Sequence, residues 1–555
     1  MITRLRDAIR ANPALAAILA LALTLNLIGI TWGLPNTEPW IADSVSGELT
    51  LKVWITYASS SHKYPYLQWW LAFLAYAPLL AWWLLTGQLD AGCWPYLKAK
   101  CFEGDPFAQL GTLILISRLL SALMGVGTVW LTWRLALAVG ASRRAALLSA
   151  LGCALAYVAV FYAHLGNLDG PMTFWYSLSL LAFVGILRRG QLRDYAAFGL
   201  SSGAALGTKE GVIGAYVLSA LAILFVQVRP AAGGDLGSPG TRPRLAATGA
   251  GLRRLVDRRM LALVFGLLLV YGLATNPVFN LPGFIAHWRD WLPSESRMQG
   301  YQAKRGLVEV TLRAARMQAA ALDLPLLLLC LAGLALSLRR WRRPEAGWPL
   351  TLLIPSLSYL AFSVYLSRIV EMRVLLPLVP VLCVYGGLAA DRLLATPPRL
   401  RRPVMGLLIL VYLHAGLHSL NHDLHFRRDS RYTAEAFLQE RVPREASILV
   451  YGSSRYVPRL AWLGYQARFV DASAASPAAL AALDPEYIVL SSRSYDRFAG
   501  QPEGAFFARL LAGESGYREL LDARSGPPLR WSFDPFQASD SVDPRISILQ
   551  RDPAR

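Results

Sequence analysis

Apolar stretches recur along the first 421 positions of the chain, and short polar segments rich in arginine separate them. An α-helix needs about 20 apolar residues to cross the roughly 30 Å hydrocarbon core of a bilayer, so this pattern predicts membrane-spanning helices. We expect about eleven crossings on this length criterion. They lie near residues 13–33, 111–133, 145–165, 171–187, 195–208, 211–228, 260–276, 321–338, 348–367, 373–390 and 404–421.

The apolar stretch at residues 66–87 differs from the others because it is rich in tryptophan and tyrosine, with tryptophan pairs at 69–70 and 82–83. Such amphipathic aromatic side chains are enriched at membrane–water interfaces. If this stretch also crossed, Arg134 would lie on the opposite side from the other basic clusters. We therefore predict a juxtamembrane or re-entrant helix here, within one long external loop at residues 34–110.

Basic clusters predict the orientation, because loops with an excess of lysine and arginine face the cytoplasm. The clusters lie at residues 134–144, 188–193, 229–259, 339–343 and 399–402. A basic segment also precedes the first apolar run, Pro13 to Gly33, which has no small-residue cleavage site and exceeds the length of a signal h-region. We expect a retained signal anchor with a cytoplasmic N-terminus in a bacterial inner membrane. An odd number of crossings then places the C-terminus outside.

The chain changes character after residue 421, so we divide it into a membrane domain at residues 1–421 and a soluble domain at 422–555. In the second part, β-type runs (SILVYG, ARFVD, YIVLSS) alternate with helical runs (AEAFLQERV, PAALAALD). This alternation predicts a small external α/β domain. Within the membrane domain, residues 229–259 are typical of a cytoplasmic linker, and residues 277–320 form a second external loop.

Composition supports a membrane protein and limits its partners. Of the 555 residues, 55% are hydrophobic and 16% charged, whereas soluble domains have about a quarter of their residues charged. The net charge of +19 does not indicate nucleic acid binding, because residues 422–555 hold 17 Arg against 17 Asp and Glu, and the excess lies in the membrane part. No helix-turn-helix, zinc-finger or RNP pattern is present. We therefore expect no nucleic acid partner.

Four ionisable residues lie at membrane depth or beside it: Asp43, Lys63, Asp169 and Lys209. Burying such groups costs several kcal/mol unless a partner or a water-filled cavity compensates, so they are candidates for a functional site. The predicted topology places all four on the external face. Each also has a structural explanation, because Asp169 can cap a helix, the lysines can extend to the interface, and Asp43 can be an ordinary loop acid.

Several other residues are candidates with less specific signals. His62 and His164 stand near Lys63 and Asp169 and could bind a metal ion or phosphate, although a lone histidine is more often structural. Arg373, in SRIVEMRVLLP together with Arg368 and Glu371, offers a phosphate or sugar contact. Cys93 and Cys101 share the first external loop, where an oxidising compartment would favour a disulfide.

These segments resemble the GT-C superfamily of glycosyltransferases, and within it the lipid-linked-sugar transferases of family 39. That family includes dolichyl-phosphate-mannose-protein mannosyltransferases and aminoarabinose transferases. Its members open the first external loop with an acidic motif, usually Asp-Glu, which Ala42-Asp43-Ser44 matches. A Lys or Tyr-Pro-Pro-Leu-like stretch on a juxtamembrane helix follows, and the segment from His62 to Leu67 matches it.

Further motifs follow in the family's order. A second external Asp matches Asp169 in FYAHLGNLDGPMTFW, a GxxxxTK turn matches Gly203 to Lys209, and MRVLLPLVPVL resembles an Arg-Tyr-x-x-Pro helix. The resemblance covers about residues 12–421 and rests on the order of short motifs.

Two residues depart from the family's pattern. Ser44 stands where the family commonly has Glu, which leaves the role of a second carboxylate to Glu48 or unassigned. Tyr66 replaces the second proline. Neither departure removes the first acid, Asp43.

The resemblance implies a GT-C fold with juxtamembrane helices and an enzyme that transfers a sugar from a polyprenyl phosphate. Asp43 would act as the general base and Asp169 as a second catalytic acid. Lys63, Lys209 and Arg373 would bind the donor phosphate. A single displacement would invert the anomeric carbon, and the acceptor would be a hydroxyl or amine of a glycan, lipid or protein.

The resemblance implies no required cofactor, and a divalent metal ion would enter only through the histidines. The alternatives that the sequence leaves open are a transporter or flippase of a lipid-linked glycan, in which ionisable groups form a relay across the bilayer, and a non-catalytic assembly protein.

Overall fold

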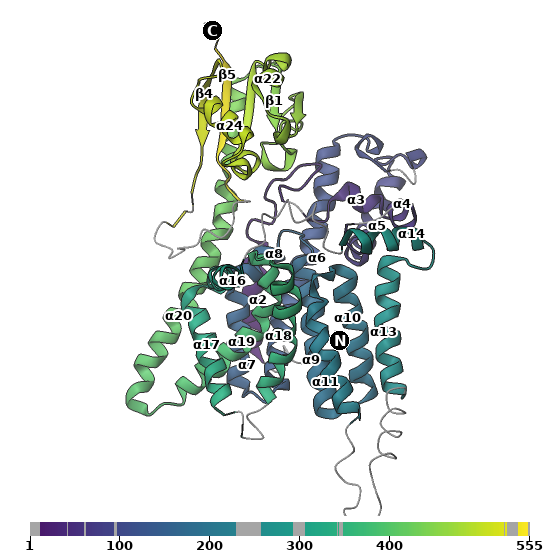
Figure 1. Ribbon diagram of the computed structural model, residues 1–555, viewed down its shortest axis with the longest axis vertical. Helices are drawn as coiled ribbons and strands as arrows, with labels where there is room; N and C mark the ends of the chain where they lie inside the picture. Colours follow the sequence, from purple (N-terminus) through teal and green to yellow (C-terminus); the bar gives the residue numbers. More distant parts are fainter. Residues whose placement is uncertain are drawn as a thin grey trace, which may run out of the picture.

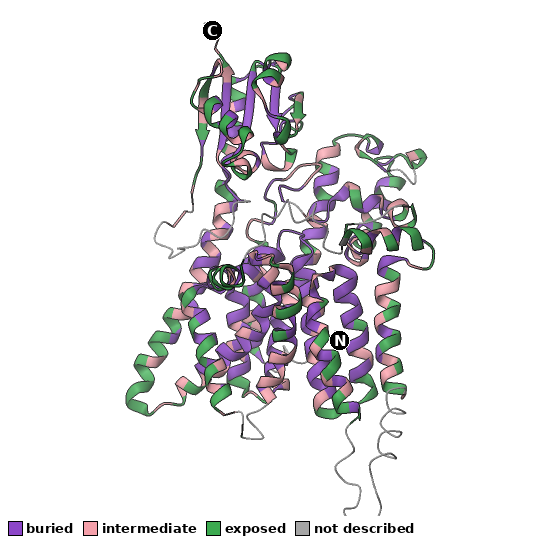
Figure 2. Cartoon of the chain, in the orientation of Figure 1, coloured by how far each residue is buried: buried purple, intermediate pink, exposed green. Residues whose placement is uncertain are grey.

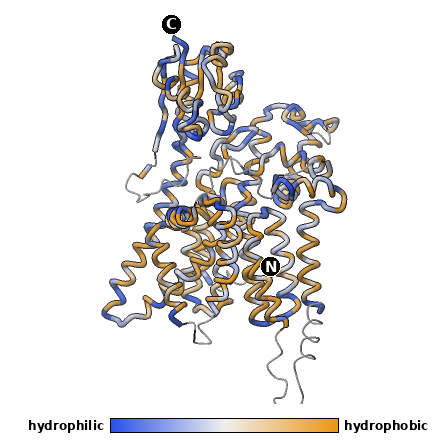
Figure 3. Tube along the Cα trace, viewed as in Figure 1, coloured by the Kyte–Doolittle hydropathy of each residue, from blue (hydrophilic) through white to orange (hydrophobic). Residues whose placement is uncertain are grey.

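The computed structural model describes residues 12–41, 43–59, 63–93, 97–228, 257–291, 306–340, 342, 348–526, 528–529 and 542–552. Most of the predicted linker at 229–259 and the histidine at position 62 therefore lie outside the described residues. The chain forms a long helical bundle with a small sheet domain at one end (Figure 1). Figure 3 shows the bundle helices as largely hydrophobic along their length, as a membrane domain requires.

Helices cover each apolar segment that the sequence predicted to cross. They are α2 (Pro13–Leu27), α6 (Pro106–Ala138), α7 (Arg143–Leu155) with α8 (Tyr157–Ala163), α9 (Asp169–Arg189), α10 (Leu192–Thr208), α11 (Gly214–Val228), α13 (Arg258–Thr275), α17 (Leu324–Arg339), α18 (Leu353–Tyr359), α19 (Val379–Leu394) and α20 (Pro398–His425). By length and apolar composition, seven of the described helices could cross a membrane, or up to nine if each bent pair is one span. The number of eleven crossings stays a prediction.

Glycines bring neighbouring bundle helices into close contact. A Cβ atom at Gly199 of α10 would lie 2.1 Å from the carbonyl oxygen of Leu263 in α13, and one at Gly333 of α17 would lie 1.9 Å from that of Tyr385 in α19. No side chain larger than hydrogen fits at these distances, so the helix backbones touch directly. The contact at Gly199 holds the glycine-rich α10 directly against α13.

A layer of short helices covers the end of the bundle that carries the sheet domain. It comprises α3 (Gly47–Leu51), α4 (Val53–Ser59), α5 (Leu67–Leu85), α14 (Leu281–Trp291) and α16 (Leu307–Leu322). Figure 1 shows α5 with α3, α4 and α14 above the ends of α10 and α13. This is where the interfacial helix was expected, although α5 is also long and apolar enough to cross. Edge-to-face contacts of Trp54 with Trp70 and Phe73 join α4 to α5.

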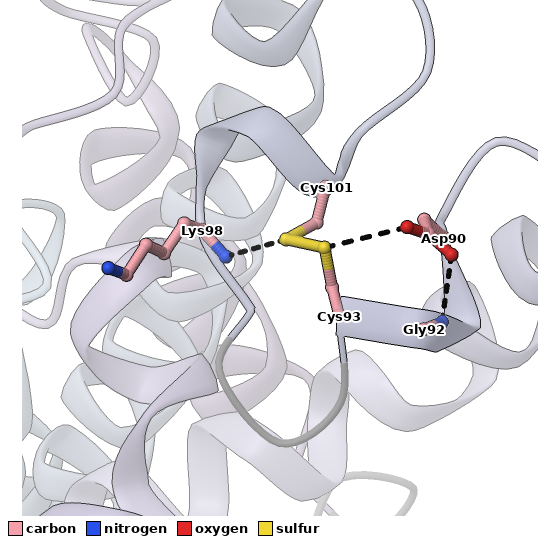
Figure 4. The surroundings of a disulfide bond; sticks show 5 residues. All are labelled: Asp90, Gly92, Cys93, Lys98 and Cys101. Carbon is pink, nitrogen blue, oxygen red and sulfur yellow. Dashed lines mark hydrogen bonds between the residues drawn. A yellow bond between two sulfur atoms is a disulfide. The ribbon is translucent and has the colours of Figure 1, made fainter.

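A disulfide closes the loop that follows α5. Cys93 and Cys101 are joined, as the sequence suggested, and the backbone N–H of Lys98 donates to the Cys101 sulfur (Figure 4). The carboxylate of Asp90 accepts from the N–H of Gly92 at 2.8 Å and caps the turn before the first cysteine. The disulfide closes this loop just before the chain enters α6.

The C-terminal domain is a five-stranded sheet with the strand order β2-β1-β3-β5-β4. The strands are β1 (Ile448–Tyr451), β2 (Ala467–Val470), β3 (Tyr487–Ser491), β4 (Tyr517–Ala523) and β5 (Ile546–Arg551), and the main helices are α21 (Ser430–Arg441), α22 (Pro477–Leu483) and α24 (Pro502–Leu511). Strand β1 is parallel to β2 and β3, and β5 is antiparallel to both of its neighbours. Strands β1 and β3 are buried throughout, as Figure 2 shows. The structure confirms the predicted β1, β2, β3, α21 and α22.

The sheet domain is fastened to the segment between α2 and Asp43. The indole N–H of Trp32 donates to Asp429 at 3.1 Å, and the backbone N–H of Gly33 donates to the Tyr432 hydroxyl at 2.8 Å. Helix α20 itself runs unbroken to His425, past the predicted domain boundary at 421/422. The domain is therefore held to the bundle both by a continuous helix and by the loop that leads into the candidate site.

Candidate active site

Asp43 lies in the turn between α2 and α3, where its backbone adopts the left-handed conformation with φ of 60°. Its side chain is only 7% exposed, and each carboxylate oxygen meets a cation. Oδ1 lies 2.8 Å from Nζ of Lys63, and Oδ2 lies 2.5 Å from a guanidinium nitrogen of Arg373. Burial raises the pKa of Asp43, but the charges of Arg373, Lys63 and Lys209 outweigh burial and hold the pKa well below its usual range.

The two cations on Asp43 come from segments far apart in the sequence. Lys63 lies four positions before the start of α5 and its side chain is 66% exposed, so it can move at little cost. Arg373 stands at the start of a 3-10 turn (Met372–Leu378) and is only 18% exposed. Its Nε donates to Glu371 at 2.6 Å, so the guanidinium bridges two carboxylates. The two carboxylates fix the orientation of the Arg373 guanidinium, whereas the exposed Lys63 side chain can change its position.

Asp169 and Lys209 form a second ion pair. Nζ of Lys209, just after α10, lies 2.8 Å from both carboxylate oxygens of Asp169, which are 3% exposed. Asp169 begins α9, where the helix dipole favours a negative charge, and its backbone N–H donates to the side chain of Asn167. The side chain of Asp169 thus makes no capping hydrogen bond to α9, contrary to its structural explanation, and instead holds Lys209.

The ring of Tyr64 connects the two ion pairs. The Nζ atoms of Lys63 and Lys209 lie 5.1 Å and 5.3 Å from its centre, so two ammonium groups share one aromatic ring. Burial raises the pKa of Tyr64, and the charge of Asp43 raises it further. Sequence reasoning did not single out Tyr64, although its position next to Lys63 was a usable signal.

The structure thus brings Asp43, Lys63, Asp169, Lys209 and Arg373 into one network with Glu371 and Tyr64. We call these seven residues the Asp43 network. It holds three carboxylates, Asp43, Asp169 and Glu371, against three cations, Lys63, Lys209 and Arg373, so it is balanced without any ligand. Glu48 of α3, the other acid that the sequence offered, pairs instead with Lys52, which directly follows that helix.

The remaining sequence candidates lie elsewhere. His164 is fully buried against Phe426, with ring centres 4.8 Å apart, and its Nδ1 is 4.0 Å from a carboxylate oxygen of Asp423. Among the described residues, no group of three or more His, Cys, Asp or Glu side chains is arranged to hold a metal ion. His62 lies outside the described residues, so its part in the site stays a prediction.

A second polar cluster adjoins Lys209 and was missed by sequence reasoning. Glu210 is 1% exposed, and its Oε1 lies 2.7 Å from Nε2 of His287 in α14 and accepts from the Tyr271 hydroxyl of α13 at 3.3 Å. This cluster ties two helices to the turn that carries Lys209. The signal was the acid directly after Lys209, but its partners stand 61 and 77 positions away.

Part of the chain matches a known family. Residues 107–244 match the family described as dolichyl-phosphate-mannose-protein mannosyltransferase, and this segment includes Asp169 and Lys209. This segment is therefore similar to a family of glycosyltransferases. The match covers about a quarter of the chain, and within that segment it agrees with the resemblance that the motifs indicated. A comparison with curated proteins finds no significant match.

The chain is also similar to solved structures of membrane glycosyltransferases, over about half of its length or more. ArnT from Cupriavidus metallidurans, bound to undecaprenyl phosphate, has a TM-score of 0.49 and 14% identity, and the similarity covers 96% of this chain and 97% of ArnT. The oligosaccharyltransferase AglB from Archaeoglobus fulgidus, in complex with an inhibitory peptide and a dolichol-phosphate, has a TM-score of 0.45 and 10% identity over 98% of this chain and 89% of AglB. The S. cerevisiae protein O-mannosyltransferase Pmt1-Pmt2 has a TM-score of 0.30 and 18% identity over 52% of this chain and 35% of that one.

Proposed function

We propose that this chain is a GT-C enzyme that transfers a sugar from a polyprenyl-phosphate donor to an acceptor hydroxyl or amine at the end of the bundle that carries the sheet domain. The observation that carries the proposal is the Asp43 network, in which a buried carboxylate meets two cations and a third cation lies across one tyrosine ring. A base and a phosphate site are the two things that this reaction needs at one place. In a bacterial inner membrane this end would face the periplasm.

The donor phosphate would be bound by Lys63, Lys209 and Arg373. As the bond between the sugar's anomeric carbon and the phosphate oxygen breaks, that oxygen takes the electron pair and the phosphate gains negative charge. Cations in a partly buried site stabilise this charge more strongly than they do in water. Lys63, the most exposed of the three, is the group that would move to the phosphate first.

Asp43 would take the proton of the acceptor as the acceptor oxygen or nitrogen attacks the anomeric carbon. With Lys63 and Arg373 on its oxygens the carboxylate is a weak base, because its pKa is held low. Transfer of Lys63 to the donor phosphate would remove one of these contacts and strengthen the base. Donor binding would therefore activate Asp43, and one displacement would invert the anomeric carbon.

Asp169 would serve as a positioning residue for Lys209 in this scheme. Both of its oxygens are occupied by the Lys209 ammonium, and its side chain is almost fully buried. An acid held in this way is not available to the acceptor in the resting site. Its contribution would be to hold the Lys209 ammonium in place beside the donor phosphate.

The test uses the full chain reconstituted in lipid with a panel of polyprenyl-phosphate hexoses, pentoses and an aminopentose. We expect sugar release or transfer with at least one donor, and its loss by about a thousandfold in Asp43→Asn, within the range for removing a general base. Glu48→Gln is the matched control, because Glu48 is an acid of the same loop that pairs only with Lys52 in the described contacts.

The outcome that contradicts the proposal is equal turnover by Asp43→Asn and the wild-type chain with a reactive donor. A product with retained anomeric configuration would contradict the single displacement while leaving the transferase activity intact. If no donor reacts and the protein instead moves a lipid-linked sugar between leaflets of a vesicle, the chain is a flippase.

A further inference from the structure

Helix α20 stands apart from the bundle along its first half. Figure 1 shows it leaning away toward the end opposite the sheet domain, and Figure 2 shows this half as largely exposed. Leu407, Ile409 and Leu410 are each more than half exposed there. A helix that separates from its neighbours within the apolar part of a membrane protein leaves a space that lipid must fill, because an empty void loses dispersion contacts.

That space is a groove of about 540 Å³ between α20, α2 and α7. Its walls include Leu21 of α2, Leu151 of α7 and Ile409 of α20, and apart from Gly416 and the ring of Tyr412 they are leucine, isoleucine and methionine side chains. The Tyr412 hydroxyl already donates to the carbonyl of Leu148. With no polar group to hold water, the groove suits a hydrocarbon chain.

The groove has the length of a lipid tail. It runs along α20 from Met405 to Leu420, and at 1.5 Å per residue this is about 22 Å, more than half of the roughly 30 Å hydrocarbon core. None of the residues of the Asp43 network lines it. It is therefore a site separate from the one described above.

Three arginines precede the groove on α20. Arg399, Arg401 and Arg402 lie in the first turns of α20, all exposed, and none contacts a carboxylate among the described residues. Asp391 is the nearest acid before them in the described sequence. Its carboxylate accepts from the Ser142 hydroxyl and forms an ion pair with Arg144. Unpaired arginines beside an apolar groove match an anionic head group joined to an apolar tail.

We propose that this groove binds an anionic phospholipid, with its head group on Arg399, Arg401 and Arg402 and an acyl chain along α20. The lipid would come from the leaflet at the end of the bundle away from the Asp43 network, which we expect to be the cytoplasmic leaflet. It would fix the angle of α20, the helix that continues directly into the sheet domain. This inference does not depend on the proposed transferase activity.

The experiment measures lipid retained by the purified full chain in native mass spectrometry, with phosphatidylglycerol and phosphatidylcholine as probes. We expect phosphatidylglycerol to bind at least tenfold more tightly than phosphatidylcholine. The Arg399→Gln, Arg401→Gln, Arg402→Gln variant should lose about tenfold or more of this preference, because each basic residue near an anionic surface contributes roughly fivefold. The matched control replaces Arg193, Arg258 and Arg259, which are exposed at the starts of α10 and α13.

A second pair of variants tests the groove itself. Ile409→Trp fills the groove and should release the lipid, whereas Leu410→Trp, one position along α20 and not part of the groove wall, should not. The proposal is overturned if phosphatidylcholine binds as well as phosphatidylglycerol, or if both arginine variants behave alike. It is also overturned if the two tryptophan variants behave alike, or if undecaprenyl phosphate displaces the phospholipid, which would make the groove a site for the donor's tail.

Discussion

The guanidinium of Arg431 lies 4.2 Å from the centre of the Trp40 ring while both carboxylate oxygens of Asp429 accept from it. Arg431 and Asp429 belong to the sheet domain, and Trp40 lies three positions before Asp43. All three side chains are fully buried. The sheet domain is therefore packed against the segment that leads to Asp43, the candidate base.

Replacing Arg431 should loosen the contact between the sheet domain and the segment before Asp43. In Arg431→Gln, Asp429 keeps its burial but loses its charged partner, which typically costs about 3–5 kcal/mol. We expect faster proteolysis in the segment before α3 and a loss of transfer of more than tenfold. The measurement is limited proteolysis together with turnover, and Arg428→Gln, an exposed arginine of the same turn, is the control. Unchanged turnover in Arg431→Gln would show that Asp43 is held without the domain.

The pair Asp169 and Lys209 should behave as one unit. Asp169→Asn leaves a nearly buried ammonium without its carboxylate, so we expect turnover to fall about a hundredfold or more. Lys209→Met should cost a similar factor, and the double variant should cost little more than either alone, because each single change already removes the pair. The measurement is a double-mutant cycle on kcat/KM. Additive losses would show that the two residues act independently.

The ion pairs of Asp43 should make stability depend on pH only in acid. The folded-state pKa of Asp43 is lowered from its ordinary value of 3.8, so its ionised form stabilises the fold fully above that value. This stabilisation is lost as the pH falls below 3.8 toward the lower folded-state pKa. The difference in Tm between wild type and Asp43→Asn should therefore be constant from about pH 5 to pH 8 and shrink below about pH 4. A difference that shrinks near pH 6 would indicate another titrating group.

Glu371 should weaken phosphate binding while it orients Arg373. It accepts from Nε of Arg373 at 2.6 Å and adds a negative charge beside the proposed phosphate site. Glu371→Gln removes this charge, so we expect polyprenyl phosphate to bind several-fold more tightly, while turnover falls because the guanidinium is less well fixed. The measurements are Kd for the carrier phosphate and kcat, with Arg373→Lys as the contrasting variant that loses both. Weaker carrier binding in Glu371→Gln would contradict this role.

The sequence alone indicated most of the Asp43 network, for a physical reason. Asp43, Lys63, Asp169 and Lys209 are charged residues next to long apolar stretches, and the cost of burying a charge marks them within their own segments. Which charge pairs with which could not be predicted. Lys209 meets Asp169 and Lys63 meets Asp43, and these choices depend on how distant helices pack.

The sequence did not predict features that depend on contacts between distant segments. Glu210 meets His287 across 77 positions, and each residue looks ordinary where it stands. Strand β4 (Tyr517–Ala523) was missed because charged residues interrupt its apolar positions and a bulge between Glu519 and Leu521 breaks its alternation. Its partner β5 completes the sheet only through that pairing.

The even balance of carboxylates and cations in the Asp43 network has a consequence for selectivity. A resting site whose charges satisfy one another presents little net field to the surrounding water, so soluble anions such as free phosphate or nucleotide sugars gain little by approaching it. A ligand must be present at high local concentration to compete for the lysines and the arginine. A carrier confined to the bilayer, diffusing in two dimensions past the helix ends, meets that condition, and a dissolved competitor does not.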